Sequence, residues 1–218
     1  MTNFAKTRAM FDIPEGMIYL NGNSLGPMPK SSPEAMMKFL NEEWRTELIK
    51  GWNTKGWFMQ PNTLGDRIGK LIGAAAGTTV VSDTLSIKVF QAVGAGLALV
   101  PDRRVILSDT GNFPTDLYMV QGLVKLKEDG YALRTVEPEA VMDAITEDVT
   151  LTEVDYRTGR KHDMAAIIAK AHSVGAVVVW DLAHSAGAIP VDVAGTDVDF
   201  AVGCTYKFLN AGPGGPAF

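Results

Sequence analysis

Hydrophobic and polar positions change their spacing along the chain in a way that predicts strands and helices in alternation. Short apolar runs predict strands over residues 79–81, 104–107, 131–135, 149–154, 176–180 and 200–203. Apolar residues at helical spacing predict helices over residues 86–99, 113–126, 138–145 and 164–173. Because strands separated by such helices join through right-handed crossovers, we predict a three-layer αβα fold with a mostly parallel sheet.

The N-terminal part of the chain follows a different pattern. Its predicted elements are a short strand at 18–20, a helix at 34–49, an aromatic loop at 52–57 and a helix at 62–73. Ser32 stands in the N-cap position of the first helix. We therefore divide the chain into an N-terminal segment and helix, residues 1–60, and one large domain, residues 61–218.

The composition narrows the classes of function. The 218 residues are 46% hydrophobic and carry a net charge of −5, which argues against nucleic acid or an anionic membrane as the main partner. The single cysteine, Cys204, excludes an internal disulfide framework and favours a reducing compartment, so we expect a cytoplasmic protein. No apolar run approaches the roughly 18 residues that a membrane helix needs.

The two ends of the chain carry further expectations. Residues 1–10 lack the apolar stretch of a secretory signal. Ala217 and Phe218 resemble the start of a strand rather than a finished terminus. We therefore expect a fragment whose large domain is incomplete at its C-terminus.

Polar and aromatic residues follow the predicted strands at the point where each strand ends. These residues are Ser86, Phe113, Thr152, Asp181 and Lys207. Because ligands of parallel α/β sheets bind beyond the carboxyl ends of the strands, we expect these side chains to face one site.

Asp181 and Lys207 together suit pyridoxal phosphate (PLP) chemistry. A lysine amine forms a Schiff base with the PLP aldehyde, and a carboxylate keeps the pyridine nitrogen protonated so that the ring accepts electrons. Tyr206 precedes the lysine and points another way, so it can reach the phosphate while Lys207 reaches the aldehyde carbon. Taken alone, the pair is equally compatible with a capping aspartate and a surface lysine.

Two predicted helix starts add candidate cofactor contacts. Residues 82–86 place small hydroxyl side chains where free backbone N–H groups suit a phosphate, although alone they favour an ordinary N-cap. Phe113, at the start of the next helix, can stack on a flat cofactor or act as a hydrophobic staple.

Other kinds of site find little support. His184 lies close enough to Asp181 to share a cleft, whereas His162 and His172 are expected to be solvated. No His, Cys and Asp cluster has the spacing of metal ligands, so we predict no metal. Neither a Walker-type phosphate loop nor a G-x-S-x-G nucleophile elbow is present.

Six motifs spread over the whole chain resemble the kynureninase family of fold-type-I PLP enzymes. They are residues 19–27, 52–53 with 56–57, 113–116, 154–159, 181–187 and 205–214. The Asp-x-x-His motif and the lysine are shared with class-V aminotransferases and cysteine desulfurases. The Asn-Gly-Asn-Ser-Leu-Gly run of residues 21–26 and the Phe-Pro-Thr-Asp run of residues 113–116 are more specific to kynureninase.

The resemblance implies roles for individual residues. Lys207 would be the catalytic Schiff-base lysine, Asp181 would partner the pyridine nitrogen, and Trp52 and Asn53 would contact the substrate. The cofactor contacts implied are Leu85, Ser86, Phe113, Pro114, Thr115, Asp116, Thr152, Asp181, His184, Tyr206 and Lys207. The family also places a Trp, an Asn and an Arg-bearing small C-terminal domain at positions that lie beyond Phe218.

The resemblance also implies a reaction and an assembly. The reaction is the PLP-dependent hydrolytic cleavage of the Cβ–Cγ bond of L-kynurenine to anthranilate and L-alanine, in tryptophan degradation and NAD biosynthesis. A Trp at position 52 leaves little room, which favours kynurenine over 3-hydroxykynurenine. The assembly is a homodimer with the site at the subunit boundary.

Two alternatives remain open. The first is another class-V PLP enzyme, such as a cysteine desulfurase, which would need a catalytic cysteine on a mobile loop. Cys204 is instead expected inside a strand. The second is a non-catalytic fragment that keeps the fold, which the binding of PLP would distinguish from an enzyme.

Overall fold

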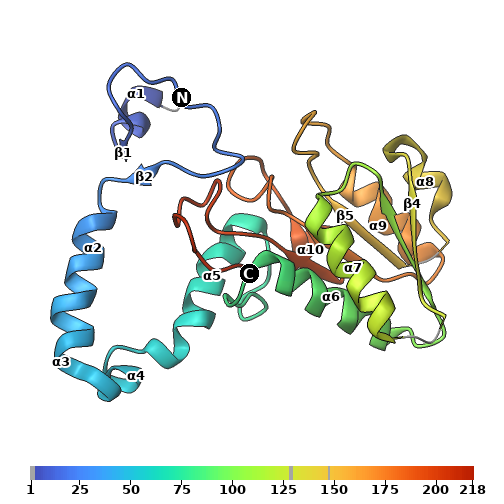
Figure 1. Ribbon diagram of the computed structural model, residues 1–218, viewed down its shortest axis with the longest axis horizontal. Helices are drawn as coiled ribbons and strands as arrows, with labels where there is room; N and C mark the ends of the chain where they lie inside the picture. Colours follow the sequence, from blue (N-terminus) through green and yellow to red (C-terminus); the bar gives the residue numbers. More distant parts are fainter. Residues whose placement is uncertain (1–2, 128–129, 147) are drawn as a thin grey trace.

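The centre of the fold is a five-stranded parallel sheet with the strand order β4-β3-β5-β6-β7 (Figure 1). The computed structural model describes residues 3–127, 130–146 and 148–218. The strands are β3 (Val105–Asp109), β4 (Ala132–Val136), β5 (Asp148–Thr152), β6 (Val178–Asp181) and β7 (Phe200–Val202). Since all five run the same way, their carboxyl ends meet at one edge of the sheet, which we call the carboxyl edge.

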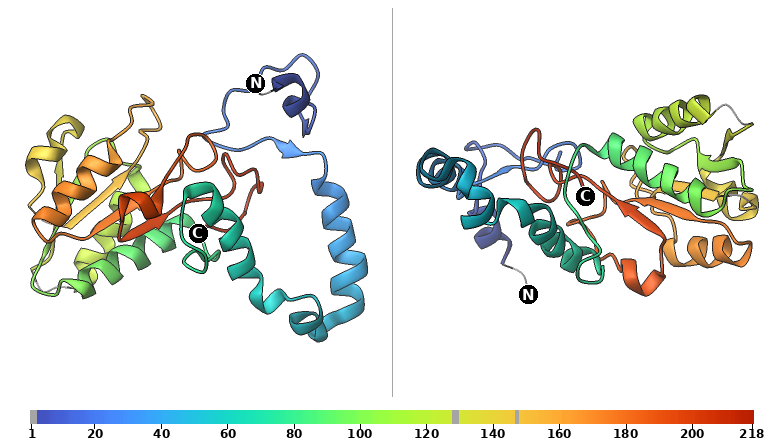
Figure 2. Two further views of the ribbon diagram at one scale, coloured as in Figure 1. Left: turned by 180° about the vertical axis from the view of Figure 1, so that it is seen from behind. Right: turned by 90° about the horizontal axis from the view of Figure 1, so that it is seen from below.

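Helices cover both faces of this sheet, as Figure 2 shows in the view from below. The helices α6 (Leu85–Leu99) and α7 (Pro114–Lys127) pack on one face. The other face is covered by α5 (Gln60–Ile72), α8 (Val141–Ala144), α9 (Met164–Ser173) and α10 (Val193–Thr196). The three-layer αβα fold with a parallel sheet is therefore confirmed.

The side chains of β6 show why the sheet needs both layers. Val178 and Trp180 are buried among α5, α8 and α9, whereas Val179 is buried against α6. Alternate residues of a strand point to opposite faces, and burying one such aliphatic side chain stabilises the fold by roughly 1.5–3 kcal/mol. A parallel strand that is apolar on both faces is stable only between two layers of helices.

The N-terminal arm, residues 3–59, extends away from the sheet in both figures. Its elements are α1 (Phe4–Arg8), the antiparallel pair β1 (Phe11–Asp12) and β2 (Met28–Pro29), α2 (Ser32–Lys38), the π-helical η1 (Phe39–Trp44), α3 (Arg45–Glu47), the 3₁₀ turn η2 (Leu48–Lys50), α4 (Gly51–Thr54) and the 3₁₀ turn η3 (Trp57–Met59). The arm then continues into α5.

Four local expectations were wrong. Residues 18–20 form no strand. Residues 79–81 form none either, and the neighbouring Ser82 makes only an isolated antiparallel bridge with Ala217. The helix expected over 34–49 is interrupted by η1 and ends where Leu48 adopts a φ of 49°. The aromatic loop at 52–57 is partly helical, since α4 covers its first residues.

The remaining strands and helices lie within a few residues of their expected bounds. The segment 138–145 begins as a 3₁₀ turn, η4 (Pro138–Ala140), before α8. Among the residues described, no helix is both long and apolar enough to span a membrane.

Candidate active site

Lys207 and His184 meet at the carboxyl edge of the sheet. Lys207 follows β7 and His184 follows β6, and both side chains are buried. The Nζ atom of Lys207 lies 2.7 Å from Nε2 of His184. Burial and the positive charge of Lys207 lower the pKa of His184 from 6.5 to about 4, so its imidazole is neutral at pH 7 and accepts a hydrogen bond from the lysine.

Aromatic rings surround this pair. The Tyr156 ring stacks on the His184 ring with centroids 6.1 Å apart, and Phe113 lies 6.0 Å from His184. Phe113 and Tyr156 themselves meet edge to face at 5.0 Å. The Nζ atom of Lys207 lies 5.3 Å from the Phe113 centroid and 5.8 Å from that of Tyr206. The amine therefore stands among flat apolar surfaces that a planar ligand can join.

Two buried carboxyl groups lie in the same site. Asp181 ends β6, and its Oδ1 accepts a hydrogen bond from Ala183 N at 2.8 Å. Asp116 lies in the first turn of α7, and burial, followed by the nearby charge of Asp181, raises its pKa well above the usual value. Burial and the neighbouring carboxyl group of Asp181 therefore favour the protonated form of Asp116.

Two buried polar atoms of the site have no hydrogen-bond partner within the described chain. They are Oδ1 of Asp116 and Nδ1 of His184. An unsatisfied buried polar atom destabilises the fold by about 1–3 kcal/mol. Such an atom in a functional site is typical where a bound ligand supplies the missing hydrogen bond. The site thus has free hydrogen-bonding capacity beside its only buried lysine among the residues that the structure describes.

The N-terminal arm touches the turn that carries Lys207. The Gly26 N–H group donates to the carbonyl oxygen of Tyr206 at 2.8 Å. Any side chain at Gly26 would collide with the carbonyl oxygen of Lys207 and the side chain of Asn210. Asn210 itself has a left-handed φ of 57° and donates its N–H to Lys207 O. The Asn-Gly-Asn-Ser-Leu-Gly run therefore ends in a close backbone contact with the lysine turn.

The two helix starts that were expected to contact the cofactor lie at the same edge of the sheet. Leu85 and Ser86 form the first turn of α6, and Thr84 precedes them in an extended conformation without a side-chain capping bond. Backbone N–H groups at this end are therefore not capped by Thr84. Pro114 and Thr115 lie half-buried in the first turn of α7. Phosphate binding at residues 82–86 stays a prediction.

Three other predicted site residues stand apart or are not fully described. Trp52 and Asn53 are exposed on α4 in the arm, away from the carboxyl edge in both ribbon figures. The backbone of Thr152 ends β5 and pairs with Asp181, whereas its side chain lies outside the described part of the structure.

Sequence reasoning missed Tyr156 as a site residue and misplaced His162. Tyr156 lies in a motif that carried the family resemblance, so that motif was the available signal. His162 was expected to be solvated but is buried, with Nε2 only 2.7 Å from Oδ2 of Asp109. Asp109 is 53 residues away in the sequence, so the spacing of residues around His162 could not predict this contact. His172 is half-exposed and pairs with Asp199.

Metal chemistry has no visible counterpart in the described residues. No group of three or more His, Cys, Asp or Glu side chains in residues 3–127, 130–146 and 148–218 could hold a metal ion. Cys204 was expected inside a strand but lies two residues beyond the end of β7, where it is buried and forms an isolated bridge with Ala217. Burial raises the pKa of its thiol, which keeps the sulfur protonated and unreactive at neutral pH.

Comparison with known proteins identifies relatives of this arrangement. Residues 122–216 match the family described as Aminotransferase class-V. The chain is 48% identical to a kynureninase from Pseudomonas fluorescens over 99% of its own length and 54% of the relative. It thus spans about half the length of this curated relative.

Solved structures show the same fold at lower identity. An apo cysteine desulfurase from Thermococcus onnurineus NA1 superposes with a TM-score of 0.78 at 22% identity, over 100% of this chain and 56% of that one. A C-DES mutant with glycine covalently linked to its PLP cofactor gives 0.78 at 20% identity, over 96% and 58%. Residues 122–216 are thus similar to class-V aminotransferases, the chain as a whole is similar to a kynureninase, and its fold is that of these solved structures.

Proposed function

We propose that this chain carries the cofactor half of a kynureninase, which cleaves L-kynurenine hydrolytically to anthranilate and L-alanine. The observation that supports this most strongly is the buried Lys207 amine at the carboxyl edge. It stands against a neutral imidazole, beside aromatic rings and two carboxyl groups. The identity to a kynureninase over nearly the whole chain supports the choice of reaction.

PLP fits the residues that the site contains. Lys207 would hold it covalently, Asp181 with Asp116 would face its pyridine nitrogen, and Phe113 or His184 would flank its ring. Leu85, Ser86 and Tyr206 are the proposed phosphate contacts, with Pro114, Thr115 and Thr152 nearby. The free Oδ1 of Asp116 and Nδ1 of His184 are the atoms that a bound ligand would satisfy. When bound, PLP supplies an electron sink for a carbanion next to the substrate amine.

The residues of this chain then have separate tasks. With PLP bound, Lys207 would take the α proton of the substrate and later return a proton to the product. His184 accepts a hydrogen bond from the amine and orients it, because the imidazole stays uncharged at neutral pH. Water adds across the Cβ–Cγ bond, so the aryl carbonyl leaves as the carboxylate of anthranilate and the three-carbon part leaves as alanine.

We infer that the substrate contacts and the assembly are linked. Trp52 and Asn53 lie on the arm and not at the carboxyl edge of their own chain, and the arm exposes many apolar side chains. A homodimer would cover those side chains and bring the arm to the site of the partner. This supports the division into an N-terminal segment, residues 1–60, and a PLP-binding domain, residues 61–218.

We further propose a preference for kynurenine over its 3-hydroxy form, a cytoplasmic location, and a role in tryptophan degradation and NAD biosynthesis. The bulk of the Trp52 side chain supports the substrate preference. Comparing kcat/KM for the two substrates on the complete gene product tests it. Equal or reversed values would contradict the preference.

A cysteine desulfurase is the alternative that the fold comparison supports. That reaction needs a reactive cysteine, and Cys204 is buried with a raised thiol pKa. Sulfide release from cysteine without anthranilate release from kynurenine would establish this alternative. A chain that binds no PLP would instead be a non-catalytic fragment.

The proposal is tested by titrating the chain with PLP and following the near-visible absorbance of the lysine Schiff base. Lys207→Ala should abolish the band, whereas Lys170→Ala, on the exposed surface of α9, should leave it unchanged. Anthranilate fluorescence then reports cleavage of kynurenine by the complete gene product. A normal band in Lys207→Ala would overturn the assignment of the lysine.

A further inference from the structure

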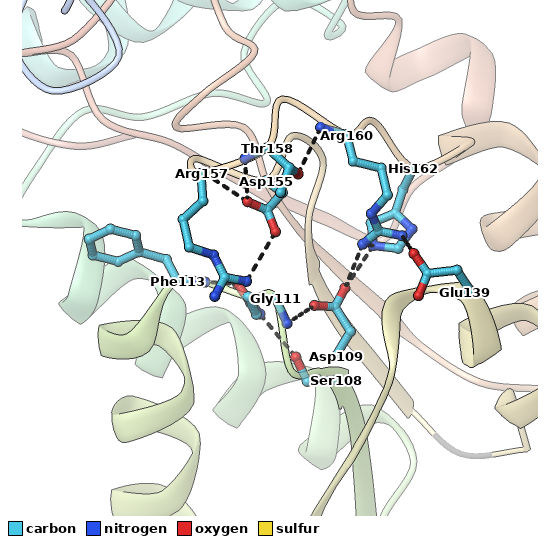
Figure 3. A network of polar contacts seen from close by, with 11 residues as sticks. Ser108, Asp109, Gly111, Phe113, Glu139, Asp155, Arg157, Thr158, Arg160 and His162 are labelled. Atoms are coloured by element: carbon cyan, nitrogen blue, oxygen red, sulfur yellow. Dashed lines mark hydrogen bonds and ion pairs between the residues drawn. The ribbon is translucent and has the colours of Figure 1, made fainter.

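A buried polar network lies beside the candidate active site and takes no part in the chemistry proposed above. Figure 3 shows it between the end of β3 and the hairpin of residues 153–162 that follows β5. Its buried polar members are Ser108, Asp109, Asn112, Asp155 and His162. Since burying so many polar groups is costly, their mutual hydrogen bonds must fix a definite arrangement of the two loops.

The hairpin of residues 153–162 presents Tyr156 to the site. Its two sides are joined by hydrogen bonds from His162 N to Glu153 O and from Asp155 N to Arg160 O, both 2.9 Å long. At the tip, Oδ1 of Asp155 accepts from the N–H groups of Arg157 and Thr158 at 2.8 and 3.1 Å. The direction of Tyr156 is thus set by the turn that Asp155 closes.

The loop after β3 presents Phe113 in the same way. Oδ1 of Asp109 accepts from Gly111 N at 2.7 Å, and Asn112 donates to Ser108 Oγ at 2.9 Å. Oδ1 of Asn112 in turn accepts from Phe113 N at 2.7 Å. The position of the Phe113 ring therefore depends on the side chain of Asp109 and on that of Asn112.

The Asp109 carboxylate ties the two loops together. Oδ2 of Asp109 lies 2.7 Å from Nε2 of His162, and both side chains are at least nine-tenths buried. The Arg160 guanidinium stands 3.9 Å from the same carboxylate oxygen. The loops also approach at Gly111, where an added Cβ would lie 2.8 Å from Oδ2 of Asp155. The Asp109 carboxylate thus anchors the Phe113 loop with one oxygen and the Tyr156 hairpin with the other.

We propose that Asp109 and His162 are positioning residues, which fix the Phe113 and Tyr156 rings around His184 and so hold its imidazole against the Lys207 amine. The Phe113 and Tyr156 ring centroids lie 5.0 Å apart, and each lies about 6 Å from the His184 centroid. A shift of either loop would therefore change the packing around the His184 imidazole. The consequence for the cofactor rests on the proposed function, whereas the ring arrangement itself does not.

A second histidine–aspartate pair provides a matched control. His172 on α9 lies 3.0 Å from Oδ2 of Asp199, with side chains 34% and 28% exposed. This pair has the same chemistry but contacts neither Phe113 nor Tyr156 among the interactions of the described chain. Replacing each histidine by leucine separates an effect on the site from a general loss of a histidine–aspartate contact.

The first measurement needs no cofactor. The chain has three histidines, so the imidazole NMR signal of His184 can be assigned by substitution and reports the rings stacked around it. His162→Leu should shift this signal, and His162→Gln, which can still donate to Asp109, should restore most of it. His172→Leu should leave the signal in place.

The second measurement uses the chain loaded with PLP. His162→Leu should weaken PLP binding about tenfold and reduce the visible circular dichroism of the bound ring, since a buried hydrogen bond to a charged group is lost. His162→Gln should bind nearly as the wild type does. If His162→Leu does not fold, Asp109→Asn replaces it, with a smaller change of the same sign.

Three outcomes decide the matter. An unchanged His184 signal and unchanged PLP affinity in a folded His162→Leu chain would overturn the positioning role. Equal effects of His172→Leu would also overturn it, because they would show a general loss of stability. Failure of the wild-type chain to bind PLP would sink the proposed function alone, because the His184 signal would still test the arrangement of the rings.

Discussion

The N-terminal arm and the carboxyl edge of the sheet depart from the usual distribution of side chains in opposite directions. The arm exposes large apolar residues: Ile18 is 83% exposed, Leu20 87% and Phe58 71%. The carboxyl edge instead buries charged groups, with Asp181 3% exposed and Lys207 5%. Soluble chains ordinarily do the reverse on both counts.

The difference indicates two kinds of missing contact. Exposed apolar side chains gathered on one segment are stabilised when another protein surface covers them. Buried charges and unsatisfied polar atoms are stabilised when a polar ligand pairs with them. The exposed arm is consistent with the homodimer proposed above, and the carboxyl edge is suited to a charged, flat cofactor.

The largest predicted effect concerns the arm. Leu20→Glu together with Phe58→Glu should raise the dissociation constant of the proposed homodimer by about a hundredfold or more. Each apolar side chain contributes roughly 1.5–3 kcal/mol on burial, and a symmetric interface contains it twice. Sedimentation velocity measures the change.

The matched control for the arm is Leu126→Glu on α7. Leu126 is 73% exposed and lies in the α/β region, so its replacement should leave association unaltered. If Leu126→Glu disrupts the dimer as much as the arm substitutions do, or if the wild-type chain is monomeric at high concentration, the contrast between the two regions fails.

A smaller effect is expected at the carboxyl edge. Asp116→Asn should raise the melting temperature of the chain without PLP by about 2–4 °C at pH 7.5. Burial and Asp181 raise the pKa of Asp116, so folding must take up or retain a proton there, whereas an amide needs none. Differential scanning fluorimetry measures the shift.

The exposed Asp102 offers the control for this prediction, and Asp102→Asn should leave the melting temperature unchanged. The same Asp116→Asn chain should bind PLP more weakly than the wild type, which separates stability from function. A lower melting temperature in Asp116→Asn would mean that the buried carboxyl group stabilises the apo chain.

The third effect is a pH dependence at His184. The pKa of its imidazole is about 4 in the folded chain, against 6.5 when exposed. Between these values the unfolded chain binds a proton that the folded chain does not, so the free energy of unfolding falls as the pH falls from 6.5 to 4. His184→Gln should make this fall shallower, as urea titrations at several pH values will show. Parallel curves for the two chains would contradict the assigned burial.

The sequence predicts the sheet and its helices well because each element has a local signature. The run before Asp181 is apolar on both faces, and the 164–173 helix matches α9 residue for residue. The placement of Asp181 and Lys207 beyond neighbouring strands follows from the parallel topology alone. These features depend on periodicity, which a single chain displays.

Contacts between distant segments could not be predicted in the same way. The pairing of Asp109 with His162, the stacking of Tyr156 on His184 and the contact of Gly26 with the lysine turn each join separate loops. The arm was harder still, since its apolar spacing predicted a regular helix over 34–49. The apolar side chains of residues 34–49 are largely exposed, and the helix is interrupted by η1.

The central claim is that Lys207 is the residue that carries PLP. Borohydride reduction of the chain with bound PLP, followed by peptide mass spectrometry, locates the cofactor directly. We predict one phosphopyridoxyl group per chain, on the peptide that contains Lys207. A group on another lysine, or no stable adduct at saturating PLP, would contradict the account.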